Sequence, residues 1–189
     1  MTFWNASRGN GANATSGSAA ISLSRELAPI ELYTARSRVV AWIETNGHRV
    51  TDLLNGQDEL RLWQPAAPRD GAEVPSSEPG ADDGEWQSLV TDQVVLAMPP
   101  EWRTNRQLRI HRKLRRVALE VDQFSITGNA HLPFGTEPGS WMLDRGPHFL
   151  PLTDAHILHR GEPPFEHVVS VVIVNTAHVT GLVPLFTLA

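Results

Sequence analysis

The chain has 189 residues, of which 41% are hydrophobic, enough for one mid-sized domain or two small ones. It contains no cysteine, which excludes a disulfide scaffold, a thiolate zinc site, an iron–sulfur cluster and a cysteine nucleophile. The formal net charge of −5 argues against a nucleic-acid binder that is basic throughout.

The first part of the chain, residues 1–28, consists mainly of Gly, Ala, Asn and Ser, so we expect a disordered tail there. It lacks the charged start, apolar middle and cleavage site of a secretory signal. The longest apolar stretch of the chain, residues 168–174, falls far short of the ~20 residues that a membrane-spanning helix needs. These features predict a cytoplasmic protein.

From Ile30 onward the chain is rich in β-branched and aromatic residues, which favour strands. Asn46-Gly47 and Asn55-Gly56 are hairpin signals, and we expect a strand over residues 50–54 between them. Leu60-Arg61-Leu62-Trp63 then alternates between apolar and polar residues. Turn signals at such short intervals predict an all-β protein of sandwich or barrel type.

Two segments differ in composition from the predicted strands. Residues 65–88 are rich in Pro, Gly and acidic residues and predict a long acidic loop. Residues 101–116 are basic and predict a linker or a helix. These segments divide the chain into a first small β-barrel over residues 30–100, which includes the acidic loop, and a second over residues 117–189.

The two halves of the chain follow a similar order, which suggests an internal duplication. At an offset near 88–89, Trp42-Ile43, the Gly47 turn, residues 53–55 and residues 59–63 align with residues 130–132, the Gly135 turn, residues 141–143 and residues 148–152. Residues 94–98 align with residues 171–175 at a shorter offset, since the acidic loop lengthens the first half.

Residues 39–55, followed by Leu60-Arg61-Leu62, resemble the first motif of Sm-like small β-barrels, and residues 172–184 are similar to the second motif. Residues 47–55 and residues 149–155 also look like an uncharacterised group of bacterial all-β domains. The resemblance implies two tandem barrels of Sm-like or SH3-like type. In second place it implies RNA binding.

A basic cluster is the most informative polar feature of the sequence. Seven of the sixteen basic residues lie in it with no acidic residue between them: Arg103, Arg106, Arg109, Arg112, Lys113, Arg115 and Arg116. On a helix, residues three apart are neighbours, so these side chains would form a cationic stripe. Because guanidinium groups bind phosphates and carboxylates, the stripe predicts an anionic partner. That partner is a nucleic acid or nucleotide, another protein, or the eleven acidic residues between positions 52 and 101 of the same chain.

Catalytic chemistry finds little support in the sequence. Asp154, His156 and His159 could converge on a metal ion, but alternation on a strand directs His159 away from the other two side chains. There is no Gly-x-Ser-x-Gly elbow and no glycine-rich phosphate loop. We therefore predict no catalytic, cofactor-binding or metal-binding residue.

These observations favour a non-catalytic binding or assembly module that mediates protein–protein contacts. Small barrels expose strand edges, which commonly pair with another copy or with a partner. Self-association or a protein partner is therefore expected, and a membrane is not. One alternative is RNA or nucleotide binding through Arg103–Arg116. The other is a metal-dependent enzyme that uses the C-terminal histidines.

Overall fold

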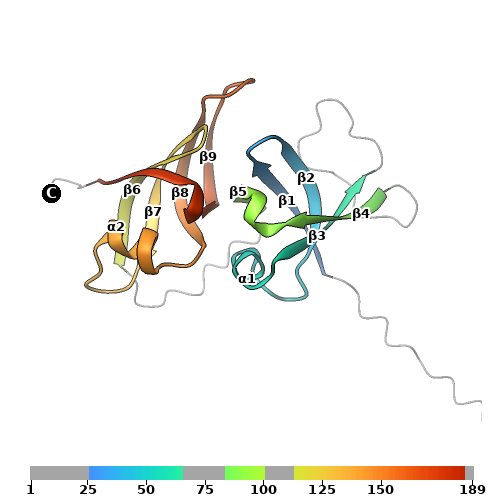
Figure 1. Ribbon diagram of the computed structural model, residues 1–189, viewed down its shortest axis with the longest axis horizontal. Coiled ribbons are helices and arrows are strands. Elements are labelled where there is room, and N and C mark those ends of the chain that lie inside the picture. Colours follow the sequence, from blue (N-terminus) through green and yellow to red (C-terminus); the bar gives the residue numbers. More distant parts are fainter. Residues whose placement is uncertain (1–25, 66–83, 101–112, 186–189) are drawn as a thin grey trace, which may run out of the picture.

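The computed structural model of the chain describes residues 26–65, 84–100 and 113–185. Within these ranges, ten strands pair antiparallel in one sheet, so the all-β prediction is confirmed. Figure 1 shows the strands in two groups, which meet where β5 (Val94–Met98) lies beside β9 (Phe165–Asn175). No helix in the described ranges is long and apolar enough to cross a membrane.

Each group holds five strands in the same chain order, and we call the groups the first and the second repeat. The first repeat comprises β1 (Leu27–Thr34), β2 (Arg38–Glu44), α1 (Val50–Gly56), β3 (Glu59–Pro65), β4 (Gly84–Val90), η1 (Thr91–Gln93) and β5. The second comprises β6 (Lys113–Val121), β7 (Phe124–Leu132), α2 (Pro138–Ser140), η3 (Trp141–Arg145), β8 (Phe149–His159), β9, η4 (Thr176–His178) and β10 (Val179–Pro184). In both repeats helical turns separate the second strand from the third, and one short turn separates the fourth from the fifth.

The order of the strands in the sheet repeats as well. It runs β10-β6-β7-β8-β9-β5-β1-β2-β3-β4, so in each repeat the fifth strand lies beside the first and the fourth lies at the far side. The two repeats join where β9, the fourth strand of the second repeat, meets β5, the fifth strand of the first. The sheet is therefore continuous and open, with β10 at one end and β4 at the other.

A shared irregularity aligns the two repeats residue by residue. In β5, Val95 lies between Val94 and Leu96, which pair with consecutive residues of β1. In β10, Thr180 lies in the same position between Val179 and Gly181, which pair with consecutive residues of β6. Each is the extra residue of a β-bulge, and each is the second residue of its strand. Residues 94–99 of the first repeat therefore correspond to residues 179–184 of the second.

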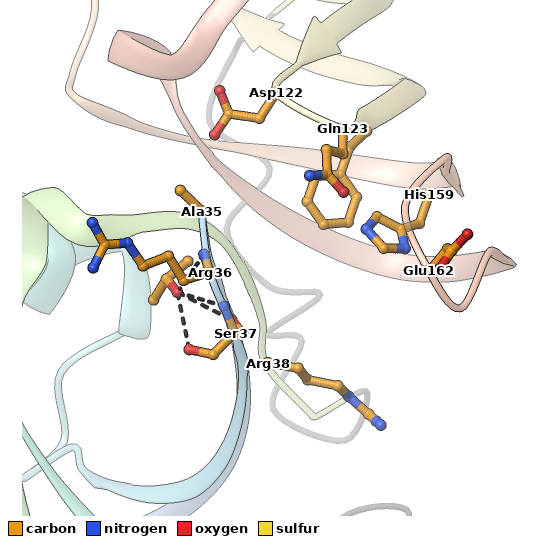
Figure 2. Close-up of a pocket in the computed structure, with 10 residues that line it drawn as sticks. Ala35, Arg36, Ser37, Arg38, Asp122, Gln123, His159 and Glu162 are labelled. Atoms are coloured by element: carbon orange, nitrogen blue, oxygen red, sulfur yellow. Dashed lines mark hydrogen bonds between the residues drawn. The ribbon is translucent and has the colours of Figure 1, made fainter.

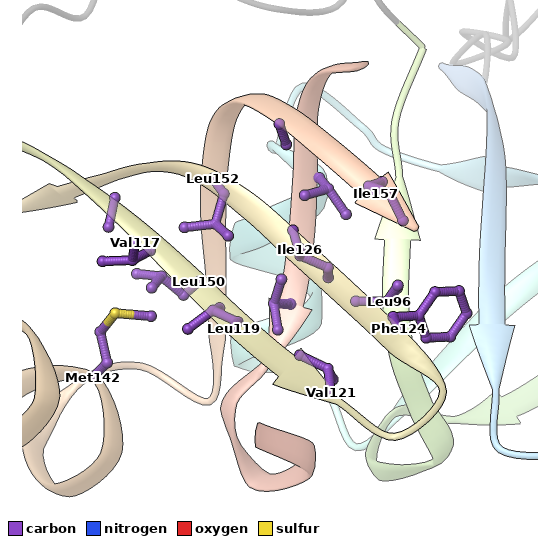
Figure 3. Close-up of a cluster of buried hydrophobic side chains, with 14 of the residues drawn as sticks. Leu96, Val117, Leu119, Val121, Phe124, Ile126, Met142, Leu150, Leu152 and Ile157 are labelled. Atoms are coloured by element: carbon purple, nitrogen blue, oxygen red, sulfur yellow. The ribbon is translucent and has the colours of Figure 1, made fainter. Parts of the chain in front are cut away.

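Each repeat has its own apolar core, built by alternation along the strands. The burial pattern of β7 alternates strictly between buried and half-buried residues over its whole length. The first core contains Ile30, Leu32, Ile43, Leu60 and Leu62, covered by α1. The second contains Val117, Leu119, Ile126, Leu152 and Ile157, and Figure 3 shows Leu96 of the first repeat among these side chains.

The expected strand over residues 50–54 is wrong, because residues 50–56 form α1. Its buried residues, Val50, Leu53 and Leu54, are three and four positions apart, which is the spacing of one helix face. A strand would have turned Leu53 and Leu54 to opposite sides of the sheet. Both leucines reach the first core because the segment is helical.

Several predicted boundaries need correction. β1 begins at Leu27 and Ala28 is fully buried, so the predicted tail ends too late. β4 takes up residues 84–88 of the predicted acidic loop, because these residues pair with β3. β6 begins at Lys113, four residues before the predicted second barrel, because residues 113–116 pair with β7. Residues 1–25, 66–83 and 101–112 lie outside the described ranges.

The predicted alignment of residues 94–98 with residues 171–175 is also wrong. The two segments lie next to each other, with Leu96 opposite Val174 and Ala97 opposite Ile173. Both sequences are apolar because each strand is buried by the other at the join between the repeats. The counterpart of β5 in the second repeat is β10.

Candidate functional site

The contact between β5 and β9, here called the joint, shows how an edge of one repeat accepts an edge of the other. Besides the paired strands, two asparagine side chains bridge the repeats. Asn55 of α1 donates through Nδ2 to the carbonyl oxygen of Phe149, and accepts through Oδ1 from the amide of Phe149, both at 2.9 Å. Asn175 donates through Nδ2 to the carbonyl oxygen of Val94 at 2.9 Å and is itself buried. Asn55 thus satisfies both backbone groups of the first residue of β8, and Asn175 satisfies a carbonyl of β5 beyond the residues that pair with β9.

The repeats also exchange apolar side chains across the joint. Tyr33, Val95 and Leu96 of the first repeat belong to the second core. Phe149 and Ile173 of the second repeat belong to the first core. Neither core is complete without the other repeat, so the joint is a permanent part of the fold.

Tyr33 is held in an aromatic cluster at the joint. Its ring lies edge-on to Phe124, with centroids 5.2 Å apart, and 5.7 Å from the ring of Phe165. Its hydroxyl donates to the carboxylate of Glu31, which also accepts from Nε of Arg38 at 2.6 Å. Burial raises the pKa of the Tyr33 phenol well above its ordinary value, and the hydrogen bond and charge of Glu31 raise it further, while Arg38 acts in the opposite direction.

This environment gives a prediction that a single chromophore can test, since Tyr33 is the one tyrosine of the chain. The neutral phenol contributes stability that is fully present below the unfolded pKa of about 10, and is lost as the pH rises through the higher folded pKa. In an absorbance titration of the folded protein, tyrosinate is expected to form only well above that pH. The urea-unfolded chain is the control and should titrate near its ordinary value. A normal titration in the folded protein would contradict the buried placement of the hydroxyl.

A polar pocket of about 500 Å³ opens beside the joint. Figure 2 shows residues 34–38, from the turn between β1 and β2, on one side of it, and Asp122, Gln123, His159 and Glu162 of the second repeat on the other. The His159 ring stacks on Phe165, with centroids 4.8 Å apart, and its Nδ1 lies 3.1 Å from the carbonyl oxygen of Pro163. Charges of both signs line this open pocket and no nucleophile–base pair lies in it, so its geometry supports no particular reaction.

The residues suggested as metal ligands contact separate partners. Asp154 accepts a hydrogen bond from Asn129 at 3.1 Å, and His156 Nε2 lies 2.6 Å from Glu166 Oε1. His159 lies in the aromatic cluster of the joint. Across the described ranges, no group of three His, Cys, Asp or Glu side chains is arranged to hold a metal ion.

The basic cluster lies partly in the described ranges. Arg103, Arg106, Arg109 and Arg112 fall outside them, whereas Lys113, Arg115 and Arg116 belong to β6. The helical stripe is therefore wrong for these three residues, which alternate between the two faces of a strand.

The described basic residues contact neighbours on or near β7. The Lys113 ammonium lies 5.9 Å from the ring centroid of Phe134, and Arg116 Nη1 lies 3.5 Å from Asn129 Oδ1. Of the three, Arg116 lies next to the residue that follows β10, because its carbonyl oxygen accepts a backbone hydrogen bond from the amide of Leu185 at 2.8 Å. One basic residue therefore lies beside the β10 end of the sheet.

The ends of the sheet carry apolar side chains that the described residues do not cover. On β4, Val90 is 42% exposed, and on β10, Val183 is 58% exposed, followed by the exposed Leu185. Leu114, on the neighbouring β6, is exposed as well. An edge strand offers unpaired backbone groups to an incoming strand, and such edges are commonly covered or blocked. We call β4 and β10 the free edges.

A row of tryptophans crosses the first repeat and ends at the β4 edge. Trp42 pairs with Trp63, and Trp63 with Trp86, on the sheet face opposite the first core. The guanidinium of Arg61 lies 4.5 Å from the Trp86 ring centroid. A side chain at Gly84 would collide with the Trp63 ring, which accounts for a glycine there. The row therefore carries an aromatic surface as far as the β4 edge.

The joint and the free edges were not predicted from the sequence as specific contacts. Exposed strand edges were expected in general, but which strands form them depends on pairing between residues far apart in the chain. One sequence signal was available, because Thr91-Asp92-Gln93-Val94 and Thr176-Ala177-His178-Val179 share the pattern Thr-x-x-Val at the turn before each fifth strand. Comparison with protein-family models, curated proteins and solved structures returned no match.

Proposed function

We propose that the protein is a non-catalytic assembly module that binds proteins by adding strands to its free edges. We propose further that its two repeats are tandem small barrels of the Sm-like or SH3-like type. The strand order 5-1-2-3-4 in each repeat and the short turn before each fifth strand support this reading.

One observation carries the functional proposal: the chain already contains, at the joint, the kind of contact that its free edges lack. β5 and β9 cover each other, and their paired residues are almost completely buried. The corresponding fifth and fourth strands, β10 and β4, each pair with a described strand on one side only, β10 with β6 and β4 with β3, and they expose Val183 and Val90. Strand addition gives affinity through backbone hydrogen bonds and selectivity through alternate side chains.

Photo-cross-linking in the host cell tests this proposal. A benzophenone amino acid replaces Ser88 on β4 or Val183 on β10, both exposed, and Thr127 in the middle of the sheet serves as the control. Strong protein adducts are expected at the two edge positions and weak ones at the control. Equal yields at all three positions, or none at the edges, would contradict the proposal, whereas adducts with RNA alone would favour the basic cluster as the binding surface.

A further inference from the structure

We infer that a second copy of this chain occupies the free edges, with β10 of one copy paired antiparallel to β4 of the next. The inference rests on the proposed function and names its partner. The argument begins from the joint, where the fifth strand of one repeat pairs with the fourth strand of the other. The free edges are a fourth and a fifth strand of the same topology, so the same contact can form between copies.

The alignment of the repeats fixes the register of this contact. Within the chain, Leu96 pairs with Val174 and Ala97 with Ile173. The bulges align Leu96 with Gly181 and Ala97 with Leu182, and the turns η1 and η4 align Leu89 with Val174 and Ser88 with Ile173. Between copies, Gly181 is therefore expected opposite Leu89, and Leu182 opposite Ser88.

The exposed Val183 lies where this register needs an apolar residue. Val183 corresponds to Met98, which packs against the second core across the joint. In the described chain Val183 is instead 58% exposed, so it lacks the cover that its counterpart has. On the other edge Val90 corresponds to Asn175, the residue that bridges the joint. An apolar residue that is covered in one repeat and exposed in the other indicates a missing partner surface.

Charge favours a head-to-tail arrangement. In the proposed register Glu85 lies opposite Leu185, which is itself next to Arg116 of β6. Glu85 of one copy and Arg116 of the next therefore lie in one row across the proposed contact, with Leu185 between them. Their opposite charges favour this arrangement, and association is expected to weaken as salt increases.

The contact between copies is expected to be weaker than the joint, because the anchoring side chains differ. The counterparts of Phe149, Ile173, Asn175 and Leu96 are Glu59, Ser88, Val90 and Gly181. Phe149 and Ile173 are thus replaced by polar residues and Leu96 by glycine, while the bridging amide of Asn175 is replaced by an apolar valine. Because the two edges differ, each copy offers one edge of each kind, and copies add head to tail until a ring closes or a filament extends. This contact is reversible and depends on concentration.

Sedimentation velocity of the full chain over a range of concentrations tests the inference. Val183→Glu sets a carboxylate opposite Gln87, close to Glu85, and is expected to weaken self-association at least tenfold. Val90→Asn supplies the amide that Asn175 supplies at the joint and is expected to strengthen it about tenfold, the effect of one added hydrogen bond. Val168→Glu and Val168→Asn are the matched controls, because Val168 is 77% exposed on β9, away from both free edges, and neither should change the association.

A charge exchange provides the rescue experiment. Glu85→Arg and Arg116→Glu should each weaken association, and the double variant should restore it. A chain that stays monomeric at every concentration, including the Val90→Asn variant, overturns the inference. If cross-links from positions 88 and 183 then lead to a different protein, the proposed function survives with another partner. If those positions give no protein adduct either, both proposals fail. The inference is also overturned if Val183→Glu leaves the strength of self-association unchanged, or if self-association requires added RNA.

Discussion

Replacing Phe149 with Ala is expected to destabilise the whole fold by about 3–5 kcal/mol, the usual cost of emptying a buried phenylalanine site. Phe149 is 1% exposed and begins β8 of the second repeat, yet its ring belongs to the first core. Truncation therefore leaves a cavity in one repeat and removes its apolar anchor to the other. Urea unfolding followed by tryptophan fluorescence measures the loss.

Phe134→Ala is the matched control, because the ring of Phe134 is 86% exposed. Its effect on the free energy of unfolding should stay within about 0.5 kcal/mol, as for ordinary surface changes. If Phe149→Ala cost no more than this control, the exchange of side chains between the cores would not hold the repeats together.

The second large effect is expected from Asn55→Ala, at about 2–4 kcal/mol, because it leaves two backbone groups of Phe149, a residue that is 1% exposed, without their hydrogen-bond partners. Both groups belong to the backbone of Phe149, and both hydrogen bonds come from the one side chain of Asn55. The side-chain Nδ2 of Asn55 also donates to the carbonyl oxygen of Thr51 at 2.9 Å, and this bond fixes the orientation of the Asn55 side chain on α1. Chemical denaturation again gives the free energy of unfolding.

Two variants separate the causes. Asn55→Asp keeps the acceptor for the amide of Phe149 but loses the donor to its carbonyl, so the free energy of unfolding should fall below that of the wild type. Gln57→Ala changes an exposed residue at the end of the same helix and should have little effect. An Asn55→Ala variant as stable as Gln57→Ala would show that solvent replaces the bridge without cost.

Local signals in the sequence predicted the strand content well, and the helix α1 shows where they failed. Asn46 and Gly47 adopt the left-handed backbone that a tight turn needs, so this turn was predictable from residue type. The second signal, Asn55-Gly56, misled, because both residues form the end of the helix α1 and Asn55 uses its side chain across the joint. The apolar spacing of Val50, Leu53 and Leu54 favours the helix, but a short segment supports either structure until its neighbours are known.

The similarity of the two halves was visible in the sequence, but the equivalent side chains differ too much to fix the alignment. Trp42 and Trp63 of the first repeat correspond by register to Asn129 and Thr153 of the second. The same backbone positions thus carry an aromatic row in one repeat and a polar row in the other. Pairing between distant strands then decided which edges joined, and the apolar character of residues 94–98 and 171–175 could not distinguish equivalent strands from neighbouring ones.

The exchange of side chains at the joint has a consequence for synthesis on the ribosome. When Met98 has been made, the first half of the chain can form its strands, but its core still lacks Phe149 and Ile173. The side chains of Tyr33 and Leu96 remain exposed to solvent until β9 has been translated. The nascent chain therefore exposes an apolar strand edge for the time needed to synthesise the second half. During this interval a chaperone, or a neighbouring nascent chain, has access to that edge.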